Sequence, residues 1–395
     1  MFFGRRIRQE NRLRHRPAWL IAGVIAFCLS LNPSSGQTSG GQLKGNAAAF
    51  PGKDWERIEK PESAGYSSAR LQALRAWVQS LDTTAMFVSV GGRSLFEYGD
   101  LTHQSYLASV RKSVLAILYG KYVENGKIQL DKTLGELEFT DVGGLSPREQ
   151  EATVEHLITA RSGIYHLASN PGDNTDSAPP RSSQRPGRYY LYNNWDFNAA
   201  GAVFEKLTGR NIYDALETDL AKPIGMQDFD RARQRKSGDA NRSQHQAYHI
   251  WFSTRDMARI GLLMLREGRW AGDQQVVSRD WARRITSVVT PLNEMNPPSL
   301  RSLGTGDRWG YGYMWWVWDA PNSPGPFEGA YTGMGAGGQY ITVLPKLDLV
   351  IAHKTDMDQP LPQGTSGRRR NVSLAEYGSI IRMLIAARCP NGRCQ

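Results

Sequence analysis

The chain has 395 residues, with 48 lysines and arginines against 38 acidic residues and a formal net charge of +10 at neutral pH. Half of that excess lies in residues 1–16, where six arginines accompany one glutamate. No basic run in the remainder is interleaved with aromatic side chains, and residues 368–370 are interpreted as a solvated loop. We therefore expect no nucleic-acid partner.

Residues 1–36 have the organisation of a secretory signal peptide. A basic segment precedes the apolar run 19–31, which is short for a membrane span and is followed by small residues suited to cleavage before Gln37. An uncleaved segment would instead anchor the chain to a membrane. Residues 37–50 are rich in Gly, Ser and Ala and are expected to form a flexible linker. Residues 51–395 are then the functional domain, periplasmic or secreted.

The chain has three cysteines, and their positions can indicate whether it is exported to an oxidising compartment. Cys28 would leave with the signal peptide, whereas Cys389 and Cys394 bracket a turn-forming sequence near the C-terminus. In an exported protein these two can close a small disulfide, although the sequence leaves the geometry open. His245 and His249 have the i, i+4 spacing of helical metal ligands but lack a third ligand in pattern, so we expect no metal.

The first elements after the linker are a helix and a hairpin. The helix is expected to begin at Ser67 or Ser68, which would cap it. Strands are expected at residues 86–90 and 94–98, on either side of a Gly-Gly pair typical of a hairpin turn. Residues 109–124 then have apolar residues at i, i+4, i+7 and i+8, which predicts a helix with one buried face.

The middle of the chain is mainly helical in pattern, at residues 154–160, 195–207 and 254–266. A polar loop over residues 168–188 is long enough to be functional rather than a mere connection. Strands return at residues 340–344 and 349–353 as a second hairpin, and a capping box at Ser373 starts the final helix.

Both ends of the chain therefore combine a helix with a hairpin, and the helical patterns lie between them. We expect the two ends to form one antiparallel sheet, with the middle inserted and packed against it. The predicted fold class is α/β of the α+β type, without internal repeats and without a second independent domain.

Ser109 and Lys112 form an S-x-x-K motif at the start of the predicted helix 109–124. Their side chains, three residues apart, share one face of the helix and can meet. The unpaired N–H groups at a helix start would stabilise an oxyanion, and the lysine can take the serine proton. About one such motif is expected by chance in a chain of this length, so a capping serine beside a solvated lysine is the alternative.

Three further segments accompany this motif. Residues 186–194 read P-G-R-Y-Y-L-Y-N-N, and the framework segments 154–164 and 253–261 read V-E-H-L-I-T-A-R-S-G-I and S-T-R-D-M-A-R-I-G. With the S-V-R-K of residues 109–112, they resemble the serine β-lactamase and penicillin-binding-protein superfamily, in its class C-related branch of esterases, D-aminopeptidases and 6-aminohexanoate-dimer hydrolases. The resemblance covers roughly residues 55–384. It implies a β-lactamase-like antiparallel sheet flanked by helices, with an inserted mainly helical region.

The resemblance implies roles for two residues of the segment 186–194. Tyr192 is the expected partner of Ser109 and Lys112, because a phenol held near an ammonium can have its pKa lowered and can relay a proton. Asn194, two residues on, is expected to hydrogen-bond Lys112 or the substrate amide. A packed aromatic side chain without a chemical role is the alternative interpretation of Tyr192.

The third motif departs from the family pattern. Where the family has K-T-G or H-T-G, this sequence continues with Tyr331, Thr332, Gly333, Met334, Gly335 and Ala336. The glycines would let the strand approach the substrate and present the second oxyanion N–H, from Met334 or Ala336. Without a cation at Tyr331, the site would fit a neutral ester or amide better than a carboxylate-bearing β-lactam. Alternatively, Tyr331 packs in the core and the register is shifted towards Gly335.

These inferences converge on an exported serine hydrolase that acts through an acyl-enzyme on a small ester or amide. Ser109 would attack, Lys112 and Tyr192 would move the proton, and water would deacylate the serine. A small molecule is the expected partner, and no metal or cofactor is implied. A penicillin-recognising or non-catalytic sensor or binding module of the same fold is the opposing hypothesis, which the altered third motif leaves open.

Overall fold

The computed structural model describes residues 49–170, 172, 174–301, 307–320, 324–359, 370–392 and 394. These residues belong to one unit of the chain that spans residues 46–395. The predicted signal peptide, and all but the last two residues of the predicted linker, lie outside the described residues. The structure therefore bears on the predicted domain, residues 51–395.

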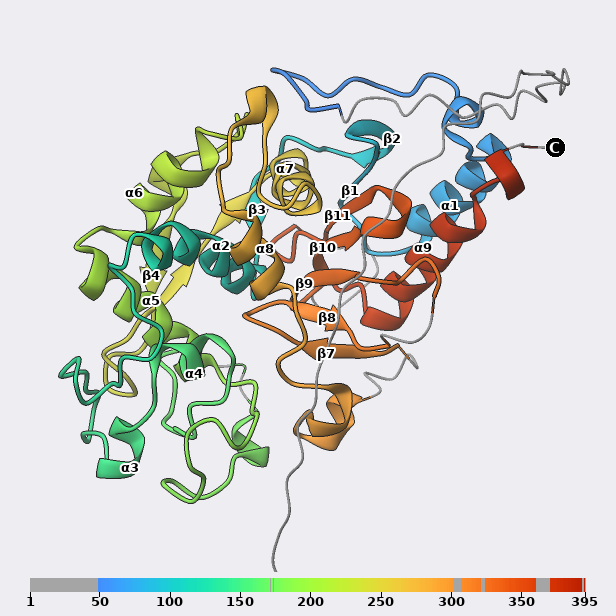
Figure 1. Cartoon of the computed structure of the whole chain (residues 1–395). Helices are drawn as coiled ribbons and strands as arrows, with labels where there is room; N and C mark the ends of the chain where they lie inside the picture. The colour runs from blue at the N-terminus through green and yellow to red at the C-terminus, as the bar shows by residue number, and fades with distance from the viewer. Residues whose placement is uncertain are drawn as a thin grey trace, which may run out of the picture. The chain divides into compact units, whose positions relative to one another are not determined.

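An antiparallel sheet forms the centre of the described part of the chain, with the strand order β2-β1-β11-β10-β9-β8-β7 (Figure 1). The strands span β1 (Ala85–Val90), β2 (Arg93–Gly99), β7 (Trp309–Tyr311), β8 (Trp316–Trp318), β9 (Tyr331–Gly335), β10 (Gln339–Leu344) and β11 (Leu349–Lys354). Neighbouring strands pair antiparallel. β1, β10 and β11 are almost entirely buried, as expected for strands covered on both faces.

The two predicted hairpins make four adjacent strands of the sheet, from the edge strand β2 to β10. β1 and β2 turn at Gly91 and Gly92, which adopt φ angles of 62° and 80°, and β10 and β11 turn at residues 345–348. β1 pairs directly with β11, with Ala85 opposite Lys354. The prediction of one sheet built from both ends of the chain is therefore confirmed.

Helices cover the sheet and fill the middle of the chain. They span α1 (Ser68–Ser80), α2 (Val110–Glu124), α3 (Pro147–Gln150), α4 (Val154–Ile158), α5 (Asn194–Thr208), α6 (Ile212–Leu216), α7 (Thr254–Leu265), α8 (Arg279–Ile285) and α9 (Leu374–Ala386). The three predicted middle helices appear as α4, α5 and α7, with ends shifted by one or two residues. None of the helices in the described ranges is both long and apolar enough to cross a membrane.

Two short strand pairs lie outside the main sheet. β3 (Ser105–Tyr106) pairs with β6 (Trp251–Phe252), and β4 (Arg235–Ser237) pairs with β5 (Ala247–His249). β3 comes immediately before the S-x-x-K motif, and β5 and β6 come immediately before α7. The pairing of β3 with β6 therefore connects the inserted region to the segment that carries the predicted nucleophile.

α7 packs across one face of the sheet, against β10, β11 and β1. The contact is close at Gly261, where a Cβ atom would lie 2.3 Å from Cγ1 of Val350. α1 and α9 pack together on the other face, where the ring of Tyr377 stacks on Tyr340 with 3.8 Å between centroids. Figure 1 shows α2 and α8 on the α7 side of the sheet. The central strands are thus covered on both faces.

Side-chain caps fix the starts of the outer helices. Ser67, one of the two predicted candidates, caps α1 by accepting a hydrogen bond from the N–H of Arg70 at 3.4 Å. Ser373 and Glu376 form the predicted capping box of α9. Caps of this kind contribute about 1 kcal/mol each, and here they orient the two helices that cover the same face of the sheet.

α2 differs from the predicted helix with one buried face. Twelve of its fifteen residues are buried, so other elements pack against every face of this helix. Trp281 of α8 donates a hydrogen bond to the Ala116 carbonyl at 2.8 Å, and Tyr119 donates to a backbone carbonyl of α5 at 2.7 Å. The buried residues include Arg111 and Lys112, which an amphipathic surface helix would expose.

The two C-terminal cysteines are joined. Cys389 and Cys394 form a disulfide with 4.8 Å between their Cα atoms. The N–H of Cys389 also donates to the Gly65 carbonyl at 2.8 Å. The closed turn after α9 is thereby attached to the segment that precedes α1.

His353 on β11 is buried and holds the turn that follows β9. Its Nδ1–H donates to the Gly338 carbonyl at 2.8 Å, and its Nε2 accepts from Oγ1 of Thr83 at 2.9 Å. Both ring nitrogens are therefore satisfied in the neutral form. Burial lowers the pKa of His353 to about 4, although the Gly338 carbonyl opposes the shift. Protonation of this ring consequently opposes folding.

We expect His353 to make the free energy of unfolding fall in acid. The unfolded side chain has a pKa of about 6.5, so between pH 6.5 and 4 the unfolded chain binds a proton that the folded chain does not. The contribution is complete above pH 6.5 and about 2 kcal/mol of it is lost by pH 5. Urea unfolding of wild type and His353→Gln at pH 7.5 and 5 measures it. An advantage of the wild type that did not shrink at pH 5 would contradict the expectation.

Candidate active site

A strained turn places Ser109 at the start of α2. β3 pairs with β6 just before the turn, and the N–H of Leu107 donates to the Ile250 carbonyl at 2.9 Å. Ala108 then adopts a φ of 48°, in the left-handed region that residues other than glycine rarely occupy. Ser109 follows with helical φ and ψ and remains half-buried. The strained residue thus turns the chain from strand to helix directly before the predicted nucleophile.

The side chain of Lys112 connects the predicted site residues. Its Nζ lies 3.1 Å from Oγ of Ser109, 2.6 Å from Oη of Tyr192 and 2.8 Å from Oδ1 of Asn194. Tyr192 is 80 residues away from Lys112 along the chain. The structure therefore brings together, on one nitrogen, the residues that the first two motifs predicted.

The S-x-x-K motif does not have the alternative role of a capping serine beside a solvated lysine. Oγ of Ser109 makes no capping hydrogen bond at the start of α2, and only 1% of Lys112 is exposed. Nζ lies 4.1 Å from the ring centroid of Tyr192 and 4.3 Å from that of Phe197. Aromatic faces at this distance stabilise a cation in a desolvated site.

Tyr192 and Asn194 lie on the segment that enters α5. Asn193, between them, caps this helix by accepting a hydrogen bond from the N–H of Asp196 at 2.9 Å, which fixes the backbone on both sides. The ring of Tyr192 lies with its centroid between 4.9 and 6.0 Å from the rings of Phe197, Trp316 and Tyr311. The ring is therefore packed among aromatic side chains, while its hydroxyl reaches Lys112.

β9 passes close to the turn that carries Ser109. A Cβ atom on Gly335 would lie 2.5 Å from the Leu107 carbonyl oxygen and 3.2 Å from the Ser109 nitrogen. A Cβ atom on Gly333 would lie 3.0 Å from Oγ of Ser113 on α2. Glycine at position 335 therefore permits an approach of strand and helix that a larger residue would prevent.

The direction of the backbone groups along β9 locates the N–H of Met334, one of the two predicted oxyanion donors. The Ala330 carbonyl accepts a hydrogen bond from the N–H of Trp318, on the β8 side, at 2.9 Å. Backbone groups of an antiparallel strand alternate between its two sides. The N–H of Met334 therefore points to the β8 side, beyond the start of β8, where α2 lies against β9. Ala336 is exposed in the turn after β9. Met334 fits the donor position better.

Tyr331 lies in the core. Its side chain is 5% exposed and packs edge-on against Trp315, with 5.4 Å between ring centroids. Burial raises the pKa of its hydroxyl well above the ordinary value, so the group stays neutral. The structure thus favours the packing alternative over a substrate-contacting role. The expectation that the missing cation at Tyr331 selects neutral substrates loses its basis, because this side chain is packed against other residues.

A cavity of about 500 Å³ opens beside Ser109. Two more predicted site residues, Asn194 and Ala336, also line it. Other lining residues were not predicted from the sequence, and they include Tyr106, Arg111, Ser169, Asn170, His249 and Met357. The sequence could have indicated Arg111 as a residue near the site, because it stands inside the S-x-x-K motif. Ser169 and Asn170 belong to the polar loop 168–188, which was predicted to be functional. The others come from short strands and loops whose contacts no local pattern encodes.

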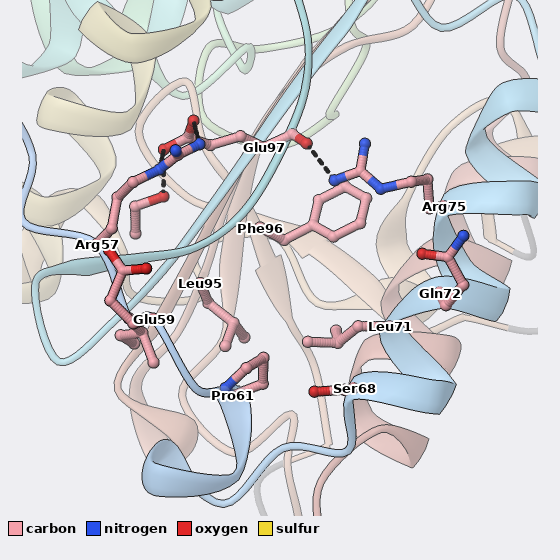
Figure 2. A pocket seen from close by; sticks show the side chains of 12 residues that line it. Arg57, Glu59, Pro61, Ser68, Leu71, Gln72, Arg75, Leu95, Phe96 and Glu97 are labelled. Carbon is pink, nitrogen blue, oxygen red and sulfur yellow. Dashed lines mark hydrogen bonds and ion pairs between the residues drawn. The ribbon is translucent and has the colours of Figure 1, made fainter.

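A second hollow of about 300 Å³ lies between α1 and the edge strand β2 (Figure 2). Arg57 forms an ion pair with Glu97, and Arg75 donates to the Glu97 carbonyl at 2.8 Å while its guanidinium lies over the ring of Phe96. The described residues around this hollow include none of the predicted site residues. The cavity beside Ser109 is therefore the candidate active site.

The two histidines with metal-ligand spacing have separate roles. His245 stacks on Phe139 with 4.2 Å between centroids, and its Nε2 donates to the Thr140 carbonyl at 2.8 Å. Nδ1 of His249 is hydrogen-bonded to Oη of Tyr106 at 2.9 Å. In the described part of the chain, no group of three or more His, Cys, Asp or Glu side chains is arranged to hold a metal.

We expect Tyr331→Lys to destabilise the fold without changing substrate preference. The substitution removes the ring contact with Trp315 and buries an ammonium, so the free energy of unfolding should fall by about 3–5 kcal/mol. Tyr331→Phe keeps the ring and should cost less than about 1.5 kcal/mol. Chemical denaturation measures both changes. A folded Tyr331→Lys protein with a selective gain in kcat/KM on carboxylate-bearing esters would contradict the core placement.

Comparison with known proteins finds similarity over most of the chain. An uncharacterised protein of Alkalihalophilus pseudofirmus is 21% identical over 268 residues, which cover 62% of this chain and 72% of that protein. The solved structure of a candidate 6-aminohexanoate-dimer hydrolase from Bacillus anthracis has a TM-score of 0.59 at 18% identity, over 86% of this chain and 87% of that one. EstCE1, a hydrolase with promiscuous acyltransferase activity, has a TM-score of 0.56 at 14% identity, over 82% and 99%.

The solved structures share the fold of this chain at low sequence identity. The family model described as Beta-lactamase matches residues 74–376. This range includes Ser109, Lys112 and Tyr192, as well as the strand β9, and it spans most of the described residues. On this evidence, the chain belongs to the beta-lactamase family.

Proposed function

We propose that the protein is a serine hydrolase that cleaves a small ester or amide through an acyl-enzyme on Ser109. One observation carries the proposal: the buried Nζ of Lys112 lies within hydrogen-bond distance of both Oγ of Ser109 and Oη of Tyr192. A nucleophile, a base and a relay need such contacts to exchange a proton. Membership of the beta-lactamase family supports the same kind of chemistry.

Acylation would begin with attack of Oγ of Ser109 on the substrate carbonyl carbon. Nζ of Lys112, in its neutral form, would take the hydroxyl proton across 3.1 Å and become the ammonium that the two aromatic faces stabilise. Tyr192 would then relay a proton to the leaving oxygen or nitrogen. The new Oγ–carbon bond forms and the bond to the leaving group breaks. The alcohol or amine departs with that proton, and the acyl group stays on Ser109.

The negative charge on the carbonyl oxygen would be held by two N–H groups. Among the described residues, the N–H of Ser109 donates to no backbone carbonyl, and it lies at the positive end of α2. The N–H of Met334 approaches from β9. Removal of one donor of this type slows acyl transfer by about 10²–10³-fold, so the close approach of Gly335 to Ser109 has a direct role in this scheme.

Deacylation would use the same groups in reverse. Water attacks the acyl carbonyl carbon and gives one proton to Tyr192. The bond between that carbon and Oγ of Ser109 then breaks, the proton passes through Lys112 to Oγ, and the carboxylic acid leaves. Asn194 accepts a hydrogen bond from Nζ of Lys112 at 2.8 Å. This bond orients the nitrogen between the serine and the tyrosine in both half-reactions.

The opposing hypothesis is a penicillin-recognising or non-catalytic sensor or binding module of the same fold. Such a protein would become acylated at Ser109 and stop there. Pre-steady-state kinetics distinguish the two functions, because the sensor would release one equivalent of product and no more. The contact between Lys112 and Tyr192 supports turnover, since a water molecule can use the same groups that serve the first step.

Ser109→Ala should abolish the hydrolysis of short p-nitrophenyl esters, because the acyl acceptor is lost. Lys112→Ala and Tyr192→Phe should each lower kcat/KM about 10²–10⁴-fold, the usual scale for general acid–base catalysis. Release of p-nitrophenol by the purified protein measures these effects. Wild-type rates in Ser109→Ala would show that another group is the nucleophile.

Matched variants separate chemistry from packing. Ser113→Ala removes a hydroxyl one turn further along α2, where it donates to the Met314 carbonyl at 2.7 Å. Tyr190→Phe removes a buried hydroxyl that has no hydrogen-bond partner among the described residues. Both variants should keep kcat/KM within a few-fold of the wild type. Losses as large as those in Lys112→Ala would indicate general disruption of the fold.

We also propose that the protein is exported. The basic and apolar segments of residues 1–31 support this, as does the disulfide between Cys389 and Cys394, since disulfides persist in oxidising compartments. Fractionation of expressing cells should recover the chain outside the cytoplasm, and intact mass should place its N-terminus near Gln37. A membrane-bound chain that retains Met1 would support the anchored alternative. A cytoplasmic chain with two free thiols would contradict export.

A further inference from the structure

Arg111 stands between Ser109 and Lys112 in the motif and carries a charge on the cavity wall. It lines the cavity beside Ser109, yet only 1% of its surface is exposed. A guanidinium remains protonated at any physiological pH. The helix that carries the nucleophile therefore also brings a fixed positive charge to the same cavity.

The described residues give this charge little compensation. Nη2 of Arg111 donates to Oδ1 of Asn198 at 3.0 Å, and the guanidinium carbon lies 4.9 Å from the ring centroid of Tyr248. The Nε–H has no hydrogen-bond partner, and no carboxylate among the described residues forms an ion pair with this side chain. A buried charge without an opposite partner is strongly unfavourable, so a position of this kind needs an explanation.

Arg259 provides the comparison. It is also 1% exposed, and Asp256 acts on it electrostatically. Among the described residues its Nε–H also has no hydrogen-bond partner, but its two Nη atoms donate to three backbone carbonyls, those of Gly52, Lys53 and Ile224. Arg111 has one amide oxygen and one aromatic face in their place. An anion that enters the cavity would supply the compensation that the protein gives to Arg259 but not to Arg111.

The wall around Arg111 presents a further donor. Tyr106 and His249 both line the cavity, and their 2.9 Å hydrogen bond joins Oη to Nδ1. Burial, with Arg111 and Arg235, lowers the pKa of His249 to about 4, so the imidazole is neutral at physiological pH. Whichever of the two groups donates this bond, the pair keeps one further donor, either Nε2–H of His249 or Oη–H of Tyr106. None of the described lining residues is acidic.

We propose that the cavity recognises substrates that carry a carboxylate, which Arg111 binds with the hydrogen-bonded pair of Tyr106 and His249 as a second donor. This inference rests on the proposed function, because it names the substrate class of the same site. The class comprises monoesters and monoamides of dicarboxylic acids, together with esters and amides whose leaving group carries the carboxylate. Arg111 is then the specificity-determining residue, and the cation absent from the third motif is supplied by α2.

The test compares carboxylate-bearing esters with neutral esters of the same length. Mono-p-nitrophenyl adipate is matched with p-nitrophenyl hexanoate, and 4-carboxyphenyl hexanoate with phenyl hexanoate. For at least one pair, the wild type should have the higher kcat/KM on the charged ester. Arg111→Met should lower that ratio about ten- to hundredfold, mainly through KM, because a charge-assisted hydrogen bond is lost. On the neutral esters Arg111→Met should lose clearly less kcat/KM than on their charged partners.

Two variants control for charge and position. Arg111→Lys keeps a positive charge and should keep part of the preference. Arg235→Met removes an exposed charge that lies over the ring of Trp251, and it should leave the ratio nearly unchanged at about 0.15 M salt because of screening. Equal losses on charged and neutral esters in Arg111→Met would overturn the proposal. So would a wild-type ratio below one for both pairs.

A binding measurement covers the case in which Arg111→Met fails to fold. Ser109→Ala protein, titrated in a calorimeter, should bind monomethyl adipate at least about tenfold more tightly than methyl hexanoate. Equal affinities would overturn carboxylate recognition even if the wild type hydrolysed neutral esters. Retained hydrolysis by Ser109→Ala would refute the proposed function instead, and release of p-nitrophenol would detect it separately from the binding measurement.

Discussion

The site depends on one buried nitrogen, Nζ of Lys112, and on the cost of removing it from water. At a surface, water would replace each of its short contacts with Ser109, Tyr192 and Asn194. Burial is tolerable only because these oxygens and two aromatic faces surround the nitrogen. They come from α2 itself and from the segment that enters α5. A lysine in this environment requires α2 to be an interior helix. This is why α2 is buried on all sides, although its apolar spacing predicted only one buried face.

Local patterns predicted the elements that a few neighbouring residues encode. The hairpin turn at Gly91, the capping box at Ser373 and the S-x-x-K motif belong to this group. Positions that depend on contacts between distant segments were not predictable. The place of Tyr331 depends on Trp315, and the choice of Met334 required the pairing of β9 with β8. Arg111 escaped notice because an arginine on a helix is ordinarily solvated, and only the packing of α2 shows that it is not.

The framework segment 253–261 shows how much of the family pattern is structural. Ser253 caps α7, and the carboxylate of Asp256 accepts hydrogen bonds from two backbone N–H groups, those of Gln227 and Asp228. Gly261 permits the close contact of α7 with β11. The segment therefore connects α7 to both the sheet and the inserted region. Its residues take no part in the proposed chemistry. They fix α7 in place, and the strand β6, just before α7, pairs with β3 next to the strained turn at Ala108.

The pairing of β1 with β11 has a consequence for how the chain acquires its structure. Ala85 and Lys354 are opposite each other in the centre of the sheet, so almost the whole domain forms the loop that this pair closes. Long-range pairing of this kind is slow, because the entropy of loop closure is lost before the contacts stabilise the product. A ribosome must also release residue 354 before the central pair can form. Completion of the sheet is therefore a late event, and β1 has no β11 to pair with until most of the chain has been synthesised.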